Sequence, residues 1–102
     1  MHTLKLSLEY KCFPIWHYDE SGELVDNDLP QELLVDKELD TLLVNLQSTF
    51  DSMFVDTPTE FRPLDFKSDE EKLKFNAEVK YILDWLKKHY ENKYVIINNI
   101  NF

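Results

Sequence analysis

The chain has 102 residues, of which 43% are hydrophobic and 14% aromatic, and it carries a formal net charge of -9 at pH 7. This length and apolar content are typical of one compact domain with a hydrophobic core, so we expect a single domain over residues 1–102. With one Gly, four Pro and no repeated block, the composition excludes collagen-like folds, repeat architectures and flexible linkers.

The charge is concentrated in the middle of the chain. Residues 19–71 contain 16 acidic and three basic side chains, a net charge of -13, whereas residues 72–102 have a net charge of +3. Nucleic-acid phosphates and anionic lipid head groups bind clustered Lys and Arg, so the acidic middle argues against direct contact with either. An acidic face instead speeds association with a basic protein surface, although the charge could equally serve solubility alone.

No segment predicts membrane insertion or export. The longest stretches without a charged residue, 41–50 and 94–102, have about half of the roughly 20 apolar residues that a membrane helix needs. Polar residues alternate through residues 1–9, where a signal peptide would be apolar, so we expect a cytoplasmic protein. Cys12 is the only cysteine and has no partner for an internal disulfide, and we expect it to be a small buried side chain.

The N-terminal part of the chain predicts strands. Residues 3–12 alternate between apolar and polar side chains, which indicates a half-buried strand. Pro14 lacks an N–H donor, so we expect a bend at residues 13–15 and a second extended segment at residues 15–18. Residues 19–23 contain Gly22 and predict a hairpin turn, which is followed by a short returning strand at residues 23–26.

Two amphipathic helices and a last strand are expected next. We expect one short helical turn at residues 31–34. Asp36 is then a good N-cap for a helix, and the spacing of the apolar residues predicts that this helix continues to about Phe54. Ser68 and Glu71 form a capping box at the start of a second helix, and residues 94–102 read as a closing strand. Residues 57–66 connect the two helices and contain two prolines. We expect three side chains to pack this connection against the rest of the domain: Phe61, Leu64 and Phe66.

The predicted order β, β, β, α, α, β is that of an α+β domain. In this fold a small, mostly antiparallel sheet, made of the N-terminal hairpin and the C-terminal strand, packs against two helices.

Metal and catalytic motifs are missing from the sequence. His2, His17 and His89 are far apart, and no Cys or carboxylate stands with them at zinc-ligand spacing. The acidic residues 19–28 lack the spacing of a calcium-binding EF-hand loop, and there is no nucleophile motif or phosphate-binding Gly loop. We therefore expect no metal, no cofactor and no enzymatic activity, with a small enzyme that uses an unrecognised carboxylate pair as an alternative.

The predicted hairpin holds the candidates for a protein interface, because aromatic side chains bordered by carboxylates are typical of an interface core with a charged rim. Trp16 is more typical of a side chain packed beneath a helix, whereas Tyr18 is a candidate contact. The candidate partner-binding residues are Tyr18, Asp19, Glu20, Glu23, Asp26 and Asp28, and the second choice is the acidic residues of the first helix, such as Asp40 and Asp51.

Residues 13–30, FPIWHYDESGELVDNDLP, resemble segments of small bacterial immunity proteins that are encoded beside polymorphic or contact-dependent toxins. The resemblance implies a single-domain, acidic, cytoplasmic inhibitor that binds a basic toxin domain, often a nuclease, and blocks its active site or substrate groove. It implies no catalytic residue. The residues themselves leave open an alternative, a regulator that mimics phosphate or nucleic acid and binds a nucleic-acid enzyme.

Overall fold

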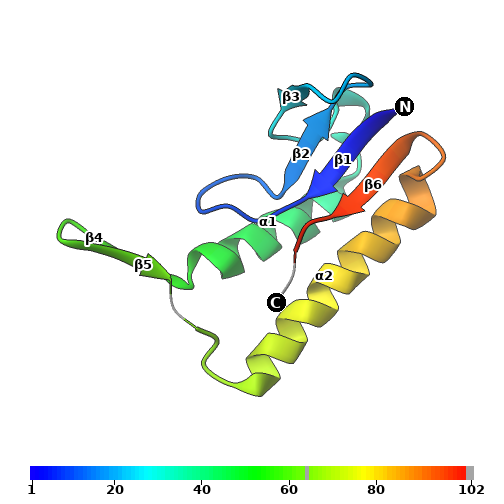
Figure 1. Cartoon of the computed structure of the whole chain (residues 1–102). Coiled ribbons are helices and arrows are strands. Elements are labelled where there is room, and N and C mark those ends of the chain that lie inside the picture. The colour runs from blue at the N-terminus through cyan, green and yellow to red at the C-terminus, as the bar shows by residue number, and fades with distance from the viewer. Residues whose placement is uncertain (64, 101–102) are drawn as a thin grey trace.

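The computed structural model describes residues 1–63 and 65–100, and it places two helices on one face of a four-stranded sheet (Figure 1). The strand order is β3-β2-β1-β6, in which β2 is antiparallel to both of its neighbours and β6 is parallel to β1. The predicted α+β fold with a mostly antiparallel sheet is therefore confirmed. The strands of the sheet are β1 (His2–Leu6), β2 (Ile15–Tyr18), β3 (Leu24–Asp26) and β6 (Tyr94–Asn98).

The first strand is shorter than its alternating sequence predicts. The strand expected over residues 3–12 ends at Leu6, and residues 7–14 form a loop that leads into β2. The loop closes where the Ser7 N–H donates to the Pro14 carbonyl at 3.0 Å, and Lys11 adopts a left-handed φ of 58°. Because residues 7–14 form this closed loop, the alternating residues 7–12 have no partner strand.

The hairpin turn between β2 and β3 is confirmed. The Asp19 N–H donates to the Glu23 carbonyl at 2.9 Å, and Gly22 has the positive φ, 86°, that the turn needs from a residue without a Cβ. The closing strand is confirmed over Tyr94–Asn98, whereas residues 101–102 lie outside the described residues.

Helix α1 (Lys37–Asp51) begins at its predicted N-cap, where the Asp36 carboxylate accepts a hydrogen bond from the Leu39 N–H at 3.0 Å. A 3₁₀ turn, η1 (Gln31–Leu33), precedes it as predicted. The helix ends at Asp51 rather than near Phe54, because Phe54 begins a further strand.

Helix α2 (Asp69–Tyr90) begins at Ser68, whose hydroxyl accepts from the Glu71 N–H at 3.1 Å as the capping box predicts. The other half of the box is wrong, because the Glu71 carboxylate accepts from the Lys67 N–H at 3.0 Å instead of from Ser68. The helix start is nevertheless satisfied by its own side chains.

The connection between the helices contains an unpredicted hairpin, β4 (Phe54–Thr57) and β5 (Glu60–Pro63), which projects away from the sheet (Figure 1). The prolines permit this pairing because Pro58 lies in the turn and Pro63 at a strand end. Phe61 remains 57% exposed, although its ring lies 5.0 Å from that of Tyr10 and 5.6 Å from that of Phe54. Of the other two expected contacts, Phe66 packs against the core and Leu64 lies outside the described residues.

The hydrophobic core lies between the sheet and the two helices. The sheet contributes Leu4, Leu6 and Ile15, which are completely buried. The helices contribute apolar side chains at the predicted three- and four-residue spacing, which are Leu39, Leu43 and Leu46 of α1 and Phe75, Val79, Ile82 and Leu86 of α2.

One carboxylate joins the start of α1 to the end of α2. While one oxygen of Asp36 caps α1, the other accepts hydrogen bonds from the Trp85 indole N–H at 3.0 Å and from the Tyr90 hydroxyl. Burial raises the pKa of Asp36, but the hydrogen bonds from Tyr90, Leu39 and Trp85 outweigh it and hold the pKa below its ordinary value of 3.8. Burial and the bond to Asp36 raise the pKa of Tyr90 to about 12.

We expect Asp36→Ala to lower the free energy of unfolding by about 2–4 kcal/mol, because α1 loses its cap and two partly buried donors lose their acceptor. Since the pKa of Asp36 is lowered in the folded state, its stabilisation is complete above pH 4 and is lost as the pH falls through the folded-state pKa. Urea unfolding of both proteins, with Glu38→Ala as the control, should show a difference that shrinks below about pH 4. A difference that is constant down to pH 2 would contradict the role of the ionised carboxylate.

Candidate functional site

The β2–β3 hairpin gathers most of the predicted binding residues at one end of the sheet. Tyr18 is the last residue of β2, Glu20 and Glu23 lie in the turn, and Asp26 ends β3. The three acidic residues are exposed, whereas Tyr18 is half-buried. The structure therefore presents exposed carboxylates on the hairpin whose first strand ends at Tyr18, and their part in binding stays a prediction.

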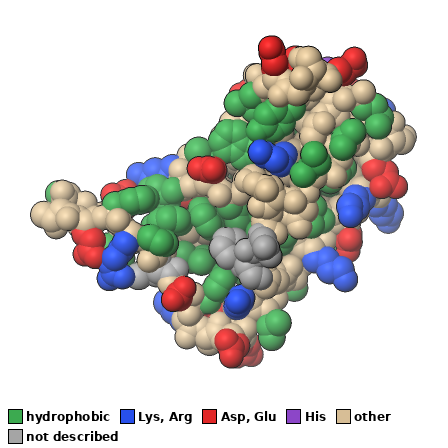
Figure 2. All heavy atoms as spheres, in the orientation of Figure 1, with side chains coloured by type: hydrophobic (Ala, Val, Ile, Leu, Met, Phe, Trp, Pro, Cys, Tyr) green, Lys and Arg blue, Asp and Glu red, His purple; other side chains and the backbone are tan. Residues whose placement is uncertain are grey.

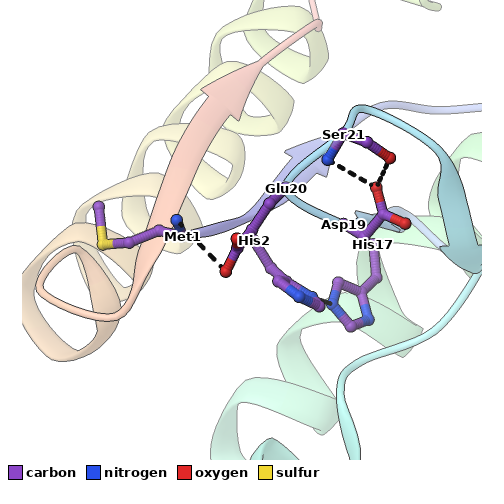
Figure 3. A network of polar contacts seen from close by, with 6 residues as sticks. All are labelled: Met1, His2, His17, Asp19, Glu20 and Ser21. Atoms are coloured by element: carbon purple, nitrogen blue, oxygen red, sulfur yellow. Dashed lines mark hydrogen bonds and ion pairs between the residues drawn. The ribbon is translucent and has the colours of Figure 1, made fainter.

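Asp19 organises this turn rather than extending from it. Its carboxylate accepts hydrogen bonds from the Ser21 hydroxyl at 2.7 Å, the Ser21 N–H at 2.9 Å and the Glu23 N–H at 3.0 Å; the side chains of Asp19 and Ser21 face each other in Figure 3. The bonds from Ser21 and Glu23 hold the pKa of Asp19 below its usual range. Because its oxygen accepts these three hydrogen bonds, Asp19 holds the backbone of the turn that carries Glu20 and Glu23.

The other acidic residues of this region differ in how far they are engaged. The Glu20 carboxylate turns toward the N-terminal ammonium, 4.0 Å away (Figure 3). Asp26 accepts from the Asn27 N–H at 2.8 Å, and Asp28, which is half-buried, accepts from the Leu29 N–H at 2.7 Å.

The second choice, Asp40 and Asp51, lies on α1 and does not form one patch. The two residues are separated by about three turns, or roughly 16 Å along the helix axis. The Asp51 carboxylate accepts from the Lys11 N–H at 2.9 Å and from the Gln47 side-chain amide at 2.8 Å, so it fastens the loop of residues 7–14 to the helix. Asp40 is half-buried in the first turn of the helix.

The sheet has an open face opposite the helices. Because side chains alternate along each strand, the residues between those of the core point away from it. The register aligns them in two rows, one that runs from Leu24 through Tyr18 and Thr3 to Val95, and one that runs from Trp16 through Lys5 to Ile97. We call these seven residues the open face. Figure 2 shows hydrophobic side chains gathered over the sheet with basic side chains among them.

Trp16 belongs to this open face, so the expectation that it packs beneath a helix is wrong. It follows the buried Ile15 in β2 and therefore points to the other side of the sheet, where it is half-buried. Its indole N–H donates to the Ser7 carbonyl at 3.2 Å, which ties the loop of residues 7–14 to β2. Cys12, in the same loop, is half-buried rather than buried.

His2 and His17, distant in sequence, meet on the covered side of the sheet. Their ring nitrogens Nδ1 and Nε2 are 2.8 Å apart (Figure 3). Burial and the nearby His2 lower the pKa of His17. Sequence reasoning missed this pair because the hairpin register, which places His17 opposite Leu4, was needed to find it. In residues 1–63 and 65–100, no three His, Cys, Asp or Glu side chains are grouped so that they could hold a metal ion.

Two tyrosines also contact acidic side chains that the sequence did not pair. The Tyr94 hydroxyl donates to Glu32, and burial together with this bond raises the pKa of Tyr94 to about 12. Tyr94, Glu32 and the two histidines border a shallow hollow at the end of the sheet. The Tyr10 hydroxyl donates to Asp56 at 3.0 Å on the β4–β5 hairpin.

A family model described as Serratia CdiI immunity protein-like matches residues 2–99, which include every strand and helix of the described chain. The chain belongs to this family. The expected resemblance to immunity proteins of contact-dependent toxin systems is thus confirmed, and the role of this CdiI-like protein is to inhibit a toxin by binding it. A search of curated proteins finds no match to the chain. Neither helix of the described residues has both the length and the apolarity to cross a membrane.

We expect Asp51→Ala to lower the free energy of unfolding by about 1–2 kcal/mol, because the Lys11 N–H and the Gln47 amide lose an acceptor. Glu23→Ala is the matched control and should stay within about 0.5 kcal/mol of the native chain, as is usual for an exposed side chain. Chemical denaturation of the free proteins measures both. Equal stability of the two variants would show that Asp51 is not a structural residue.

Proposed function

We propose that this CdiI-like protein neutralises a basic toxin domain, specifically a nuclease, by placing the acidic β2–β3 hairpin in its active site or substrate groove. The observation that carries the proposal is the group of exposed carboxylates, Glu20, Glu23 and Asp26, on the hairpin that also carries Tyr18 and whose turn Asp19 holds in shape. A nuclease acts on nucleic acid in the cytoplasm, and its inhibitor would act in the same compartment.

Electrostatics support a basic target. A nuclease must attract phosphates, so its substrate groove carries Lys and Arg side chains. A chain with a net charge of -9 that presents its carboxylates on a hairpin is attracted by the same side chains, and this long-range attraction raises the association rate. The Asp19 carboxylate accepts hydrogen bonds from two backbone N–H groups of the turn, so less of the turn's backbone has to be ordered on binding.

The contributions of single residues should be uneven. A carboxylate at the edge of an interface contributes little, whereas one that becomes buried against an Arg or Lys of the partner contributes a great deal. Glu23 is exposed and Glu20 makes only the 4.0 Å ion pair with the N-terminal ammonium, while Asp28 is half-buried and bonded to the backbone. Tyr18 supplies the large aromatic contact that interface centres favour.

We therefore expect one or two of four alanine variants to weaken the complex by about 2–5 kcal/mol and the others to have small effects. The variants are Glu20→Ala, Glu23→Ala, Asp26→Ala and Asp28→Ala, and Tyr18→Ala should weaken the complex as strongly. Titration calorimetry with the toxin domain encoded directly beside the gene measures the affinity, and thermal unfolding confirms that the free variants fold. Glu70→Ala, an exposed acid at the start of α2, is the control.

If the hairpin variants bind normally and Asp40→Ala or Asp51→Ala does not, the contact lies on α1. In that case the affinity of Asp51→Ala has to be compared with its stability, since the Asp51 carboxylate also holds the loop of residues 7–14. If the hairpin variants and the α1 variants all bind the toxin domain with native affinity, the proposal that the acidic surface makes the contact is wrong.

Salt provides a second test of the electrostatic mechanism. We expect the association rate with the toxin domain to fall about tenfold or more between low and high ionic strength, while the dissociation rate changes less. The reason is that salt screens the attraction between separated charges but acts weakly on contacts that are already buried. Stopped-flow mixing at several salt concentrations measures the rates, and a flat association rate would contradict the mechanism.

A further inference from the structure

We infer that the open face of the sheet is the apolar centre of the toxin interface, and that the toxin places an acidic or carbonyl acceptor group opposite Lys5. This inference rests on the proposed function, in which the adjacent hairpin contacts the toxin. It adds a second surface and a second sign of charge to that contact.

The open face is apolar and continuous with the acidic hairpin. Leu24, Val95 and Ile97 are 52%, 42% and 43% exposed, although they lie on strands, and Trp16 and Tyr18 are half-buried beside them. Neither helix covers these side chains, because α1 and α2 pack on the core side of the sheet. Exposed apolar side chains that form a contiguous patch with a polar rim are typical of protein-binding surfaces. Leu24 pairs with Tyr18 at the hairpin, so the patch and its acidic rim meet there.

The size of the face indicates that it is the centre of a larger contact. Four strands of three to five residues, spaced about 4.8 Å apart and rising about 3.3 Å per residue, present a face of about 270 Å². A stable protein complex buries about 800 Å² on each partner. The open face supplies less than half of that area, and the acidic hairpin at its edge supplies a polar rim of the kind that surrounds interface centres.

Lys5 determines what the partner must offer. It lies near the middle of the face between Trp16 and Ile97, and its ammonium group is 5.1 Å from the centre of the Tyr18 ring. None of the ion pairs found among the described residues involves Lys5. A partner that covers the face removes water from this charge, and a buried charge without a counter-group is costly. The toxin surface must therefore place an acceptor there, surrounded by apolar side chains and bordered by basic ones.

A second copy of the chain does not meet this requirement. In a face-to-face dimer, a two-fold axis through the centre of the sheet brings Lys5 of one copy against Lys5 of the other.

The β4–β5 hairpin fits a docked partner less well. Its charges are already paired, Asp56 with Lys11 at 3.5 Å and Glu60 with Arg62, and its Phe61 ring packs on Tyr10 and Phe54 within the chain.

The test measures affinity and dissociation rate for the toxin domain encoded directly beside the gene. Lys5→Glu is compared with Lys80→Glu, an exposed position on α2 that changes the net charge by the same amount. Ile97→Ser is compared with Leu73→Ser, which removes a 70% exposed leucine from α2. We expect Lys5→Glu to raise Kd about 30-fold or more and Ile97→Ser about tenfold, mainly through faster dissociation, with both controls within about threefold.

Thermal unfolding of the free chain shows whether Lys5→Glu folds. If it does not, Lys5→Met, which keeps the apolar stem of the side chain, replaces it and should raise Kd about fivefold or more, since the acceptor on the toxin loses its partner. Normal toxin binding by the Lys5 and Ile97 variants would overturn the inference, and loss of a dimer in sedimentation without loss of toxin binding would assign the face to a second copy. The proposed function fails separately, if the native chain does not bind the toxin domain or binds it independently of the hairpin.

Discussion

The parallel pairing of β6 with β1 is the constraint on which the rest of the structure depends. Parallel neighbours cannot be joined by a tight turn, so the chain must cross over the sheet before β6, and α2 supplies the last part of that crossing. Asp36 then holds the start of α1 against the end of α2 through Trp85 and Tyr90. Both helices are thereby committed to one face, and the other face of a four-stranded sheet is left to solvent or to a partner.

The acidic residues divide into two groups that the charge count cannot separate. Asp19, Asp36, Asp51 and Glu71 accept hydrogen bonds from backbone N–H groups and thereby fix a turn, a helix start, a loop and a second helix start. Glu20 and Glu23 are exposed in the turn that Asp19 holds. All of these carboxylates contribute to the long-range attraction of a basic partner, but the first group also stabilises local structure, whereas the second is exposed for direct contact.

The sequence predicted what depends on local chemistry and missed what depends on distant contacts. Asp36, Ser68 and Gly22 were identified because a cap or a left-handed turn requires a particular residue at a particular position. The end of β1 at Leu6 and the β4–β5 hairpin were missed, because Asp51 and the Tyr10 ring act on these segments from about 40 or more residues away. Trp16 was misplaced for a related reason: the face that it occupies follows from the burial of Ile15, which only the assembled sheet determines.

The proposed interface combines two kinds of charge that act at different stages of binding. Carboxylates on the hairpin attract any basic surface, and nucleases share such surfaces, so steering alone selects a class of partner rather than one toxin. A positive charge in the middle of an apolar face has the opposite effect, since it penalises every partner that lacks an acceptor at that point. In the proposed interface Lys5 opposes the overall charge of -9 and lies where a bound toxin excludes water, so we assign it little attraction and much discrimination. In this proposal the acidic rim sets the association rate, and the apolar centre around Lys5 selects the toxin.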